Sequence, residues 1–148
     1  MSLKAPINVK ALFSDTLGEK FHEFKLPPPS FEIMQCEILE FDAKKKSIVV
    51  KMPVLDLWLN PYGTMQGGMI IGAVDNAVGP LSLLVAPKNM TRNIESKLLK
   101  PITEDIKYIY VTAALVEQKK RRLIFDAVVQ DKAKNIYAKA TLTNWILS

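Results

Sequence analysis

The sequence predicts an α+β domain in which one antiparallel sheet of about six strands covers one long apolar helix. Three observations predict this fold class. Apolar residues surround the helical circumference between Gly67 and Leu81, where Asp75 and Asn76 are the only polar side chains. Apolar and polar residues alternate with a period of two on both sides of that stretch. The connections between alternating segments at residues 119–122 and 132–135 are short, which favours antiparallel pairing.

The N-terminal part precedes the sheet. Residues 7–17 are expected to form a short amphipathic helix that stops at Gly18, because helical spacing connects Val9, Leu12, Phe13, Thr16 and Leu17. Residues 19–30 end in Leu26 and three prolines, which is typical of a stiff extended connection. A spacer is favoured over a recognition role for these prolines. The single histidine, His22, is interpreted as a surface or packing residue, although a lid position would leave its role open.

Six strands are expected around the helix. Alternation begins at Phe31 and changes phase at Ile38 and Leu39, which predicts a first strand with a bulge before Asp42. A lysine turn at residues 44–46 then joins it to a second strand at 48–54, so the two form a hairpin. After a loop at 56–65 and the long helix, four more strands are expected at 91–99, 105–118, 121–131 and 136–147.

Composition describes one globular domain over residues 1–148, with 1–30 as the N-terminal helix and proline-rich connection. The chain is 49% apolar and has 6 glycines, so a substantial core is expected. The first residues lack a long apolar region, so no secretory signal is expected. The apolar helix is close to membrane-span length, but Asp75, Asn76, Gly79 and Pro80 at its middle argue against a span.

Cysteine content and charge limit the setting and the ligand. The single cysteine, Cys36, excludes an internal disulfide and favours the cytoplasm, and we interpret it as a small buried hydrophobe in a strand. The net charge of +5 raises the question of an anionic partner, but its magnitude alone does not choose one. A nucleic-acid binder is expected to have a basic stripe with interleaved aromatics or a binding motif, and the sequence has neither. A small ligand that carries phosphate suits the positive charge as well as a nucleic acid does.

The central helix holds the candidate site. Asp75 is expected to be buried, where a charged carboxylate costs several kcal/mol unless partners compensate or its pKa rises. Gly67 and Gly68 follow Gln66 at the expected helix start, where the first amides lack intrahelical partners and form a candidate oxyanion site. Tight packing of the loop explains the glycines without a ligand.

The spacing of Gln66 and Asp75 predicts a dimer. Asp75 lies nine positions after Gln66, which is about 13.5 Å along a helix axis and roughly half a turn out of phase. If both belong to one site, a second subunit must supply one of them, which predicts a two-fold dimer with two equivalent sites. A purely structural role for Asp75 is the alternative.

These residues resemble a known family. The pattern Asn60, Gly63-Thr64, Gln66-Gly67-Gly68 and Asp75 resembles the signature of hotdog-fold acyl-CoA thioesterases of the phenylacetyl-CoA thioesterase type. The resemblance implies a hotdog fold over nearly the whole chain, an acyl-CoA substrate, no other cofactor and no metal. It also implies a homodimer or a dimer of dimers.

The resemblance implies a role for each site residue. Asp75 would be the general base or nucleophile, Gly67 N–H would bind the thioester oxygen, and Asn60 and Gln66 would position substrate or water. Thr91 would assist the attacking water from the same subunit as the acid. The chain departs from the family at Gln66, where histidine is usual; a glutamine amide donates hydrogen bonds but does not titrate near neutral pH.

Further residues are candidates for substrate binding. Four lie close in sequence to Gly68 and are candidates for an apolar acyl pocket, although core packing explains them equally well: Trp58, Leu59, Met65 and Met69. Four basic residues at 119–122 are candidates for binding the CoA phosphates, although a solvated turn explains them too: Lys119, Lys120, Arg121 and Arg122.

Two readings of function follow. The first is an acyl-CoA thioesterase, and the second, indicated by Gln66, is a hotdog protein that binds acyl-CoA or acyl-lipid without hydrolysing it. A hotdog dehydratase or hydratase is disfavoured, because those enzymes use a histidine beside their acid and the central stretch has none. A DNA-binding regulator of this architecture is disfavoured because no separate helix-turn-helix segment is found.

Overall fold

A computed structural model of the chain describes residues 4–148, so residues 1–3 of the predicted domain lie outside the described part. The helical elements are α1 (Val9–Leu17), η1 (Gly18–Glu23), α2 (Pro29–Ile33), η2 (Asp56–Trp58), α3 (Gly67–Val85) and η3 (Glu104–Ile106). The strands are β1 (Glu37–Asp42), β2 (Ser47–Pro53), β3 (Asn89–Leu98), β4 (Tyr108–Lys119), β5 (Arg122–Gln130) and β6 (Ile136–Ile146).

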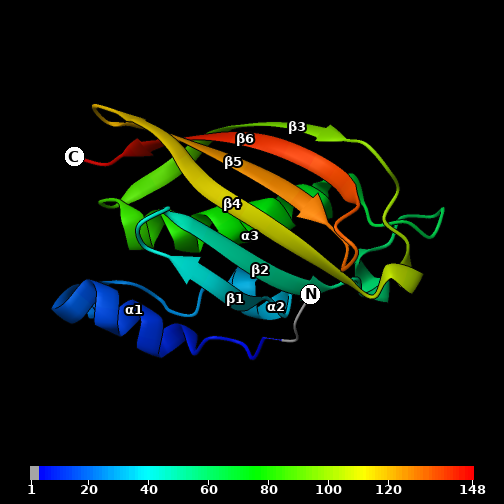
Figure 1. Ribbon diagram of the computed structural model, residues 1–148, viewed down its shortest axis with the longest axis horizontal. Helices are drawn as coiled ribbons and strands as arrows, with labels where there is room; N and C mark the ends of the chain where they lie inside the picture. The colour runs from blue at the N-terminus through cyan, green and yellow to red at the C-terminus, as the bar shows by residue number, and fades with distance from the viewer. Residues whose placement is uncertain (1–3) are drawn as a thin grey trace.

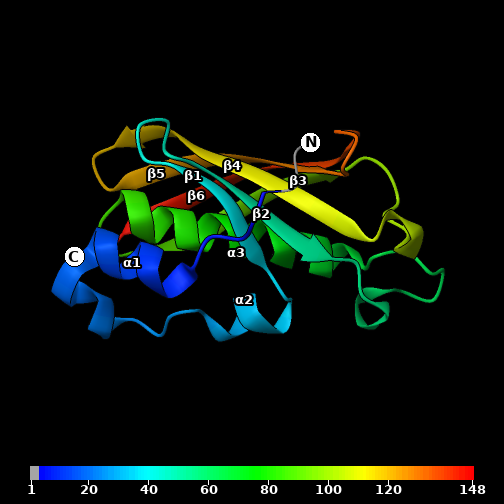
Figure 2. The ribbon, with the colours of Figure 1, turned by 60° about the horizontal axis from the view of Figure 1, so that its bottom comes forward.

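The six strands form one antiparallel sheet that covers α3. Their order across the sheet is β1-β2-β4-β5-β6-β3, so β1 and β3 are the edge strands. Figure 1 shows the sheet curving over α3, and Figure 2 shows the N-terminal segment on the side of α3 away from the sheet. The predicted fold class, with its single long helix and short N-terminal helix, is confirmed.

The core lies between α3 and the concave face of the sheet. Alternate residues of β2, β5 and β6 point inward, as in β5, where Leu123 and Phe125 are fully buried between exposed or half-buried neighbours. One face of α3 packs against these side chains through its buried residues, which include Ile70, Ala73, Val74, Ala77, Val78 and Leu81. This packing fixes the orientation of α3 about its axis.

The prediction that Asp75 is buried is wrong for the single chain, because Asp75 is exposed. The sheet covers only one face of α3. The opposite face carries Gly68, Gly72, Asp75 and Gly79, which recur every three or four residues and therefore share one side of the helix. These small residues add little apolar area, so the apolar composition of α3 overstated how much of it is buried.

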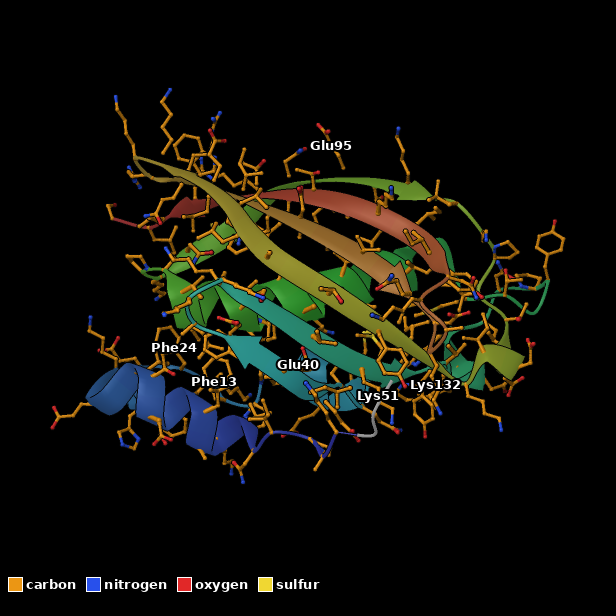
Figure 3. All side chains as sticks on the ribbon, viewed as in Figure 1. Phe13, Phe24, Glu40, Lys51, Glu95 and Lys132 are labelled. Carbon is orange, nitrogen blue, oxygen red and sulfur yellow. The ribbon has the colours of Figure 1, made fainter. Side chains whose placement is uncertain are left out.

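The N-terminal helix is part of the core. Asn8 caps α1 by accepting a hydrogen bond from Ala11 N–H at 2.9 Å, and the helix ends at Gly18 with a φ of 58°. Phe13 of α1 is fully buried, and Figure 3 shows Phe13 and Phe24 between α1 and the rest of the fold. Ile7 N–H donates to the carbonyl of Ile38, so this segment also covers part of the β1 edge.

The connection from residue 19 to residue 36 differs from its prediction. Residues 18–23 form the 3-10 helix η1, and Pro29 starts α2 at a position where its missing N–H has no cost. The strand expected from Phe31 therefore begins at Glu37. Phe31 and Met34 are both buried, and their separation of three residues is a helical spacing. The alternation that begins at Met34 concealed this short helix in the sequence.

The hairpins agree with the prediction more closely. The predicted bulge in β1 is present as a register shift between Ile38 and Glu40. The connections at residues 43–46, 120–121 and 131–135 join antiparallel neighbours, and each contains a lysine with positive φ. The strand expected from residue 105 begins instead at Tyr108, because residues 104–106 form η3.

By length and hydropathy alone, α3 is a candidate membrane span, and it is the one such helix among residues 4–148. Half of its apolar window is buried inside the fold, and the core helix of a globular domain passes the same test. Asp75 and Pro80 lie in its middle. These features agree with the interpretation of α3 as a core helix.

Candidate active site

The carboxylate of Asp75 lies on the exposed face of α3 and is held by Thr91. Thr91, near the start of β3, donates a hydrogen bond from Oγ1 to Asp75 Oδ1 at 3.1 Å. The contact arises because β3 runs back along α3 after the break at residues 86–88. Asp75 keeps a second oxygen that accepts no protein hydrogen bond from residues 4–148, so it is free to accept a proton from water.

Asp75 and Thr91 line a hollow of about 370 Å³, which we name the Asp75 hollow. Gly79 and Leu83 of α3 and Met90 of β3 also line it. The N-terminal segment contributes Phe24, Leu26, Pro28 and Ser30, and several polar residues complete the lining: Asn76, Ser82, Lys88, Asn89 and Asn144. The hollow therefore places the Asp75 carboxylate and the Thr91 hydroxyl beside apolar side chains of the N-terminal segment.

The N-terminus of α3 forms the other half of the predicted site. Gln66 is the N-cap of α3, and its Oε1 accepts a hydrogen bond from Met69 N–H at 3.1 Å. Its own N–H donates to the Trp58 carbonyl at 2.8 Å, which fixes the approach of the chain to the helix. The Nε2 group donates to no protein acceptor among the described residues. Gln66 is therefore a structural cap that still presents a donor.

Both glycines after Gln66 have a steric reason. A Cβ on Gly68 would lie 2.9 Å from Gln66 Oε1, so a side chain there would displace the cap. A Cβ on Gly67 would lie 3.1 Å from Leu98 Cδ1, which shows how closely the end of β3 packs on the helix start. In the described part of the chain the N–H groups of Gly67 and Gly68 have no hydrogen-bond acceptor, so they are available to an anionic group, and their role as oxyanion donors stays a prediction.

The loop before α3 is organised by Asn60. Its Oδ1 accepts hydrogen bonds from Tyr62 N–H and Thr64 N–H, and its Nδ2 donates to Thr64 Oγ1 at 2.9 Å. Gly63 completes the turn with a φ of 78°, which glycine adopts at little cost. The Asn60 amide thus holds its own turn. A role toward the substrate stays a prediction for this residue.

A second hollow, of about 260 Å³, lies at this end and is named the Gly67 hollow. Asn60, Gly67, Ile70, Leu98 and Lys100 are among the residues that line it. No residue lines both hollows. The structure therefore brings Asp75 together with Thr91, and Gly67 together with Asn60, but it does not bring the two pairs together within one chain.

The four predicted acyl-pocket residues lie at the Gly67 end. Met65 is buried in the core at 3% exposure, and Trp58, Leu59 and Met69 are half-buried against it. None of the four lines the Asp75 hollow. Core packing explains their positions, and an acyl pocket formed by them stays a prediction.

The predicted phosphate patch is at the opposite end. Arg122 pairs across the sheet with Trp145, which in turn pairs with Met90, so the turn at 119–122 lies beside the strand end that carries Thr91. Arg121 Nε donates to the Ile146 carbonyl at 3.0 Å, and Arg122 pairs with Glu117 at 3.6 Å. Lys119 and Lys120 are exposed. Phosphate binding by this turn stays a prediction.

Cys36 lies outside both hollows. It is buried, and this burial raises the pKa of its thiol to about 12, so the thiol is neutral at physiological pH. It lies immediately before β1 rather than within it. The interpretation of Cys36 as a small buried hydrophobe is confirmed, and a neutral thiol is a poor nucleophile.

Sequence reasoning missed the residues that the N-terminal segment contributes. Phe24, Leu26 and Pro28 were part of an expected spacer, and the structure places them in the wall around Asp75. Asn76 was noted only as a polar residue of the helix, yet its Oδ1 accepts from Ser30 Oγ at 3.0 Å. Two apolar residues flanking a proline run were the available signal, because a pure spacer needs no apolar side chains.

The fold places the chain in a structural class. A six-stranded antiparallel sheet that curves over one long central helix is the hotdog fold, which the sequence resemblance implied. Solved structures of this class align with nearly the whole chain. No protein-family model matches the sequence, and no curated protein matches it significantly.

Three structural neighbours illustrate the likeness. The PaaI protein of the phenylacetic acid degradation operon from E. coli has a TM-score of 0.77 at 14% identity, over 95% of this chain and 97% of that one. A Streptococcus mutans protein bound to acetyl CoA has a TM-score of 0.72 at 23% identity, over 86% and 95%. A hypothetical thioesterase with coenzyme A from Streptococcus pneumoniae has a TM-score of 0.70 at 20% identity, over 76% and 86%.

Proposed function

We propose that this protein hydrolyses an acyl-CoA thioester to the free acid and CoA. The observation that carries the proposal is the exposed Asp75 carboxylate, held by the Thr91 hydroxyl in a hollow with an apolar wall. A carboxylate with a free oxygen beside a hydroxyl is able to bind and deprotonate a water molecule. The structural neighbours that carry CoA or acetyl CoA support the choice of thioester.

The chemistry needs a base and an oxyanion donor. In the general-base route, Asp75 takes a proton from water as the water oxygen attacks the thioester carbon. Gly67 N–H stabilises the developing oxyanion, a contribution of about 3–4 kcal/mol for one donor in comparable sites. Collapse of the tetrahedral intermediate breaks the C–S bond, and the proton passes to the CoA thiolate. In the nucleophilic route, Asp75 attacks the carbon itself and the C–S bond breaks to release CoA thiolate; water then hydrolyses the mixed anhydride to the free acid and the Asp75 carboxylate, and a proton from that water passes to the thiolate.

The two halves of the site would meet across a two-fold axis. The helix start with Gly67 and the Asp75 hollow are separate in one chain, so the partner subunit would supply the oxyanion donors to each Asp75. Two features support such a dimer. The outer edge of β3 pairs with no strand of residues 4–148, and α3 exposes a glycine-rich face that allows another helix to approach closely.

A thiol-release assay tests the proposal. Purified protein is expected to release CoA from acetyl-CoA, octanoyl-CoA or phenylacetyl-CoA. Asp75→Asn is expected to lower kcat by a factor of about 100 or more, because a general base contributes 10²–10⁴-fold. Asp126→Asn, which changes an exposed carboxylate on β5, is the matched control and should keep full activity. Unchanged turnover in Asp75→Asn, at an unchanged melting temperature, would refute the assignment.

Gln66 favours a second candidate function, a hotdog protein that binds acyl-CoA or acyl-lipid without hydrolysis. Its amide does not titrate near neutral pH, and its Oε1 is already engaged as the helix cap. A binder would show a raised melting temperature with acyl-CoA and no thiol release over hours. The same samples distinguish the two functions.

A further inference from the structure

The N-terminal segment contributes apolar side chains to the Asp75 hollow. We name residues 24–30 the strap. Its Phe24, Leu26 and Pro28 line the hollow that contains Asp75, and Figure 2 shows this segment on the side of α3 away from the sheet. All three side chains are half-buried, so they are neither free in solution nor part of the closed core. An apolar wall beside a reactive carboxylate points to an apolar substrate group.

The strap is held in place by a clamp next to Asp75. Asn76 accepts a hydrogen bond from Ser30 Oγ at 3.0 Å, and its Nδ2 donates to the Ser30 carbonyl at 3.2 Å. The same Nδ2 lies 3.1 Å from Met34 Sδ. Three prolines at 27–29 have no backbone N–H to donate, and Pro29 already begins α2, so the Asn76 contacts help to fix the position of the strap. The clamp therefore ties the wall to the residue that follows Asp75.

We infer that the strap is the specificity-determining wall of the acyl site, and that it selects an apolar acyl group of medium length or with an aromatic ring. This inference rests on the proposed thioesterase function. The acyl group would lie between the strap and α3, with its carbonyl carbon at Asp75 and its body against Phe24 and Leu26. The hollow of about 370 Å³ is at the small end of the range for small-molecule sites.

A filling substitution tests the inference. Leu26→Trp is expected to occupy the hollow, so kcat/KM for octanoyl-CoA should fall by more than tenfold while that for acetyl-CoA stays within threefold. The expected loss is about fourfold for each methylene that is excluded from the wall. Leu17→Trp is the matched control, because Leu17 is a half-buried leucine of the N-terminal segment that does not line the hollow. The control should leave the ratio of the two substrates unchanged.

Two further variants keep the test decisive if Leu26→Trp does not fold. Phe24→Ala should widen the hollow and raise the ratio of dodecanoyl-CoA to octanoyl-CoA turnover several-fold. Asn76→Ala should release the strap and raise KM for octanoyl-CoA while kcat changes little, because Asn76 acts as a positioning residue. A loss of melting temperature with an unchanged chain-length profile would show a merely structural role for both residues and overturn the inference.

The two proposals fail in different ways. If wild type hydrolyses acyl-CoA but no strap variant alters the chain-length profile, the inference is wrong and the thioesterase function stands. If wild type hydrolyses nothing, the same series is measured as equilibrium binding of acyl-CoA thioethers of two to twelve carbons. If strap variants then change which chain length binds best, the strap lines the acyl site although the protein does not hydrolyse the thioester. A change in oligomeric state on Leu26→Trp would show that the partner subunit covers the strap, which also overturns the inference.

Discussion

Gln66 has two separable properties, and two substitutions separate them. Oε1 caps α3 by accepting from Met69 N–H at 3.1 Å, whereas the Nε2 group presents donors at the helix start. Gln66→Ala removes the cap and the donors together. Gln66→Glu keeps an acceptor at the cap and removes only the donors. The pair therefore distinguishes a residue that shapes the helix from one that contacts the thioester.

The stability effects have opposite signs. Loss of an N-cap acceptor costs about 0.5–2 kcal/mol, so Gln66→Ala should lower the melting temperature by roughly 1–8 °C at 2–4 °C per kcal/mol for a chain of this size. A carboxylate at a helix N-terminus adds about 0.3–1 kcal/mol. Gln66→Glu should therefore melt at the wild-type temperature or a few degrees above it.

The kinetic effects should agree in sign. If Nε2 donates to the thioester oxygen, both variants lose kcat/KM in the thiol-release assay, by about 10²–10³ for Gln66→Ala. Gln66→Glu should lose at least as much, because its negative charge lies beside the developing oxyanion. Gln66→His keeps a ring donor and should retain measurable activity. Wild-type kcat/KM in Gln66→Glu would refute the donor role and leave Gln66 as a cap alone.

Three further predictions concern stability and reactivity. Phe13→Ala should cost about 3–5 kcal/mol, because Phe13 is fully buried between α1 and the core; a thermal melt within 2 °C of wild type would show that α1 is not part of the cooperative unit. Burial raises the pKa of the Cys36 thiol to about 12, so an aromatic disulfide reagent at pH 8 should label it only after denaturation, and rapid labelling of native protein would contradict this. The free energy of unfolding should also decline as pH rises above about 9, because the thiol ionises more readily in the unfolded chain. The side-chain hydrogen bond from Asn135 is the main cause that lowers the pKa of Asp131. The contribution of Asp131 to the free energy of unfolding should therefore be present near neutral pH and lost as pH falls below about 4. Asp131→Asn should reduce this acid dependence of stability in urea unfolding, and an unchanged dependence would contradict the assignment.

The sheet and the central helix could be predicted because their signals are local. Alternation in β5 and β6 reports which side chains face the core, and the apolar run after Gln66 reports a helix that the sheet must cover. The bulge after Ile38 left a phase change that is visible in the sequence. Each of these patterns follows from the geometry of one element, so no long-range information is needed.

The exposure of Asp75 and the strap could not be predicted in the same way. Which face of α3 remains uncovered depends on how far the sheet curves, and small residues look apolar whether or not they are buried. The short helix α2 overlaps a strand-like alternation, so its period was ambiguous until the contacts of Phe31 and Met34 were known. The strap lines a hollow only because α3 packs beside it, and the Ser30–Asn76 contact that joins them spans 46 residues of sequence.

The two edges of the sheet are treated unequally, and this asymmetry limits assembly. Ile7 and the Lys4–Glu40 ion pair obstruct the β1 edge, whereas the ten residues of β3 stay open. A sheet with one open edge can pair with only one other sheet through its backbone. Two copies that join through β3 would leave no further open edge, so growth would stop at a closed pair rather than continue into a filament.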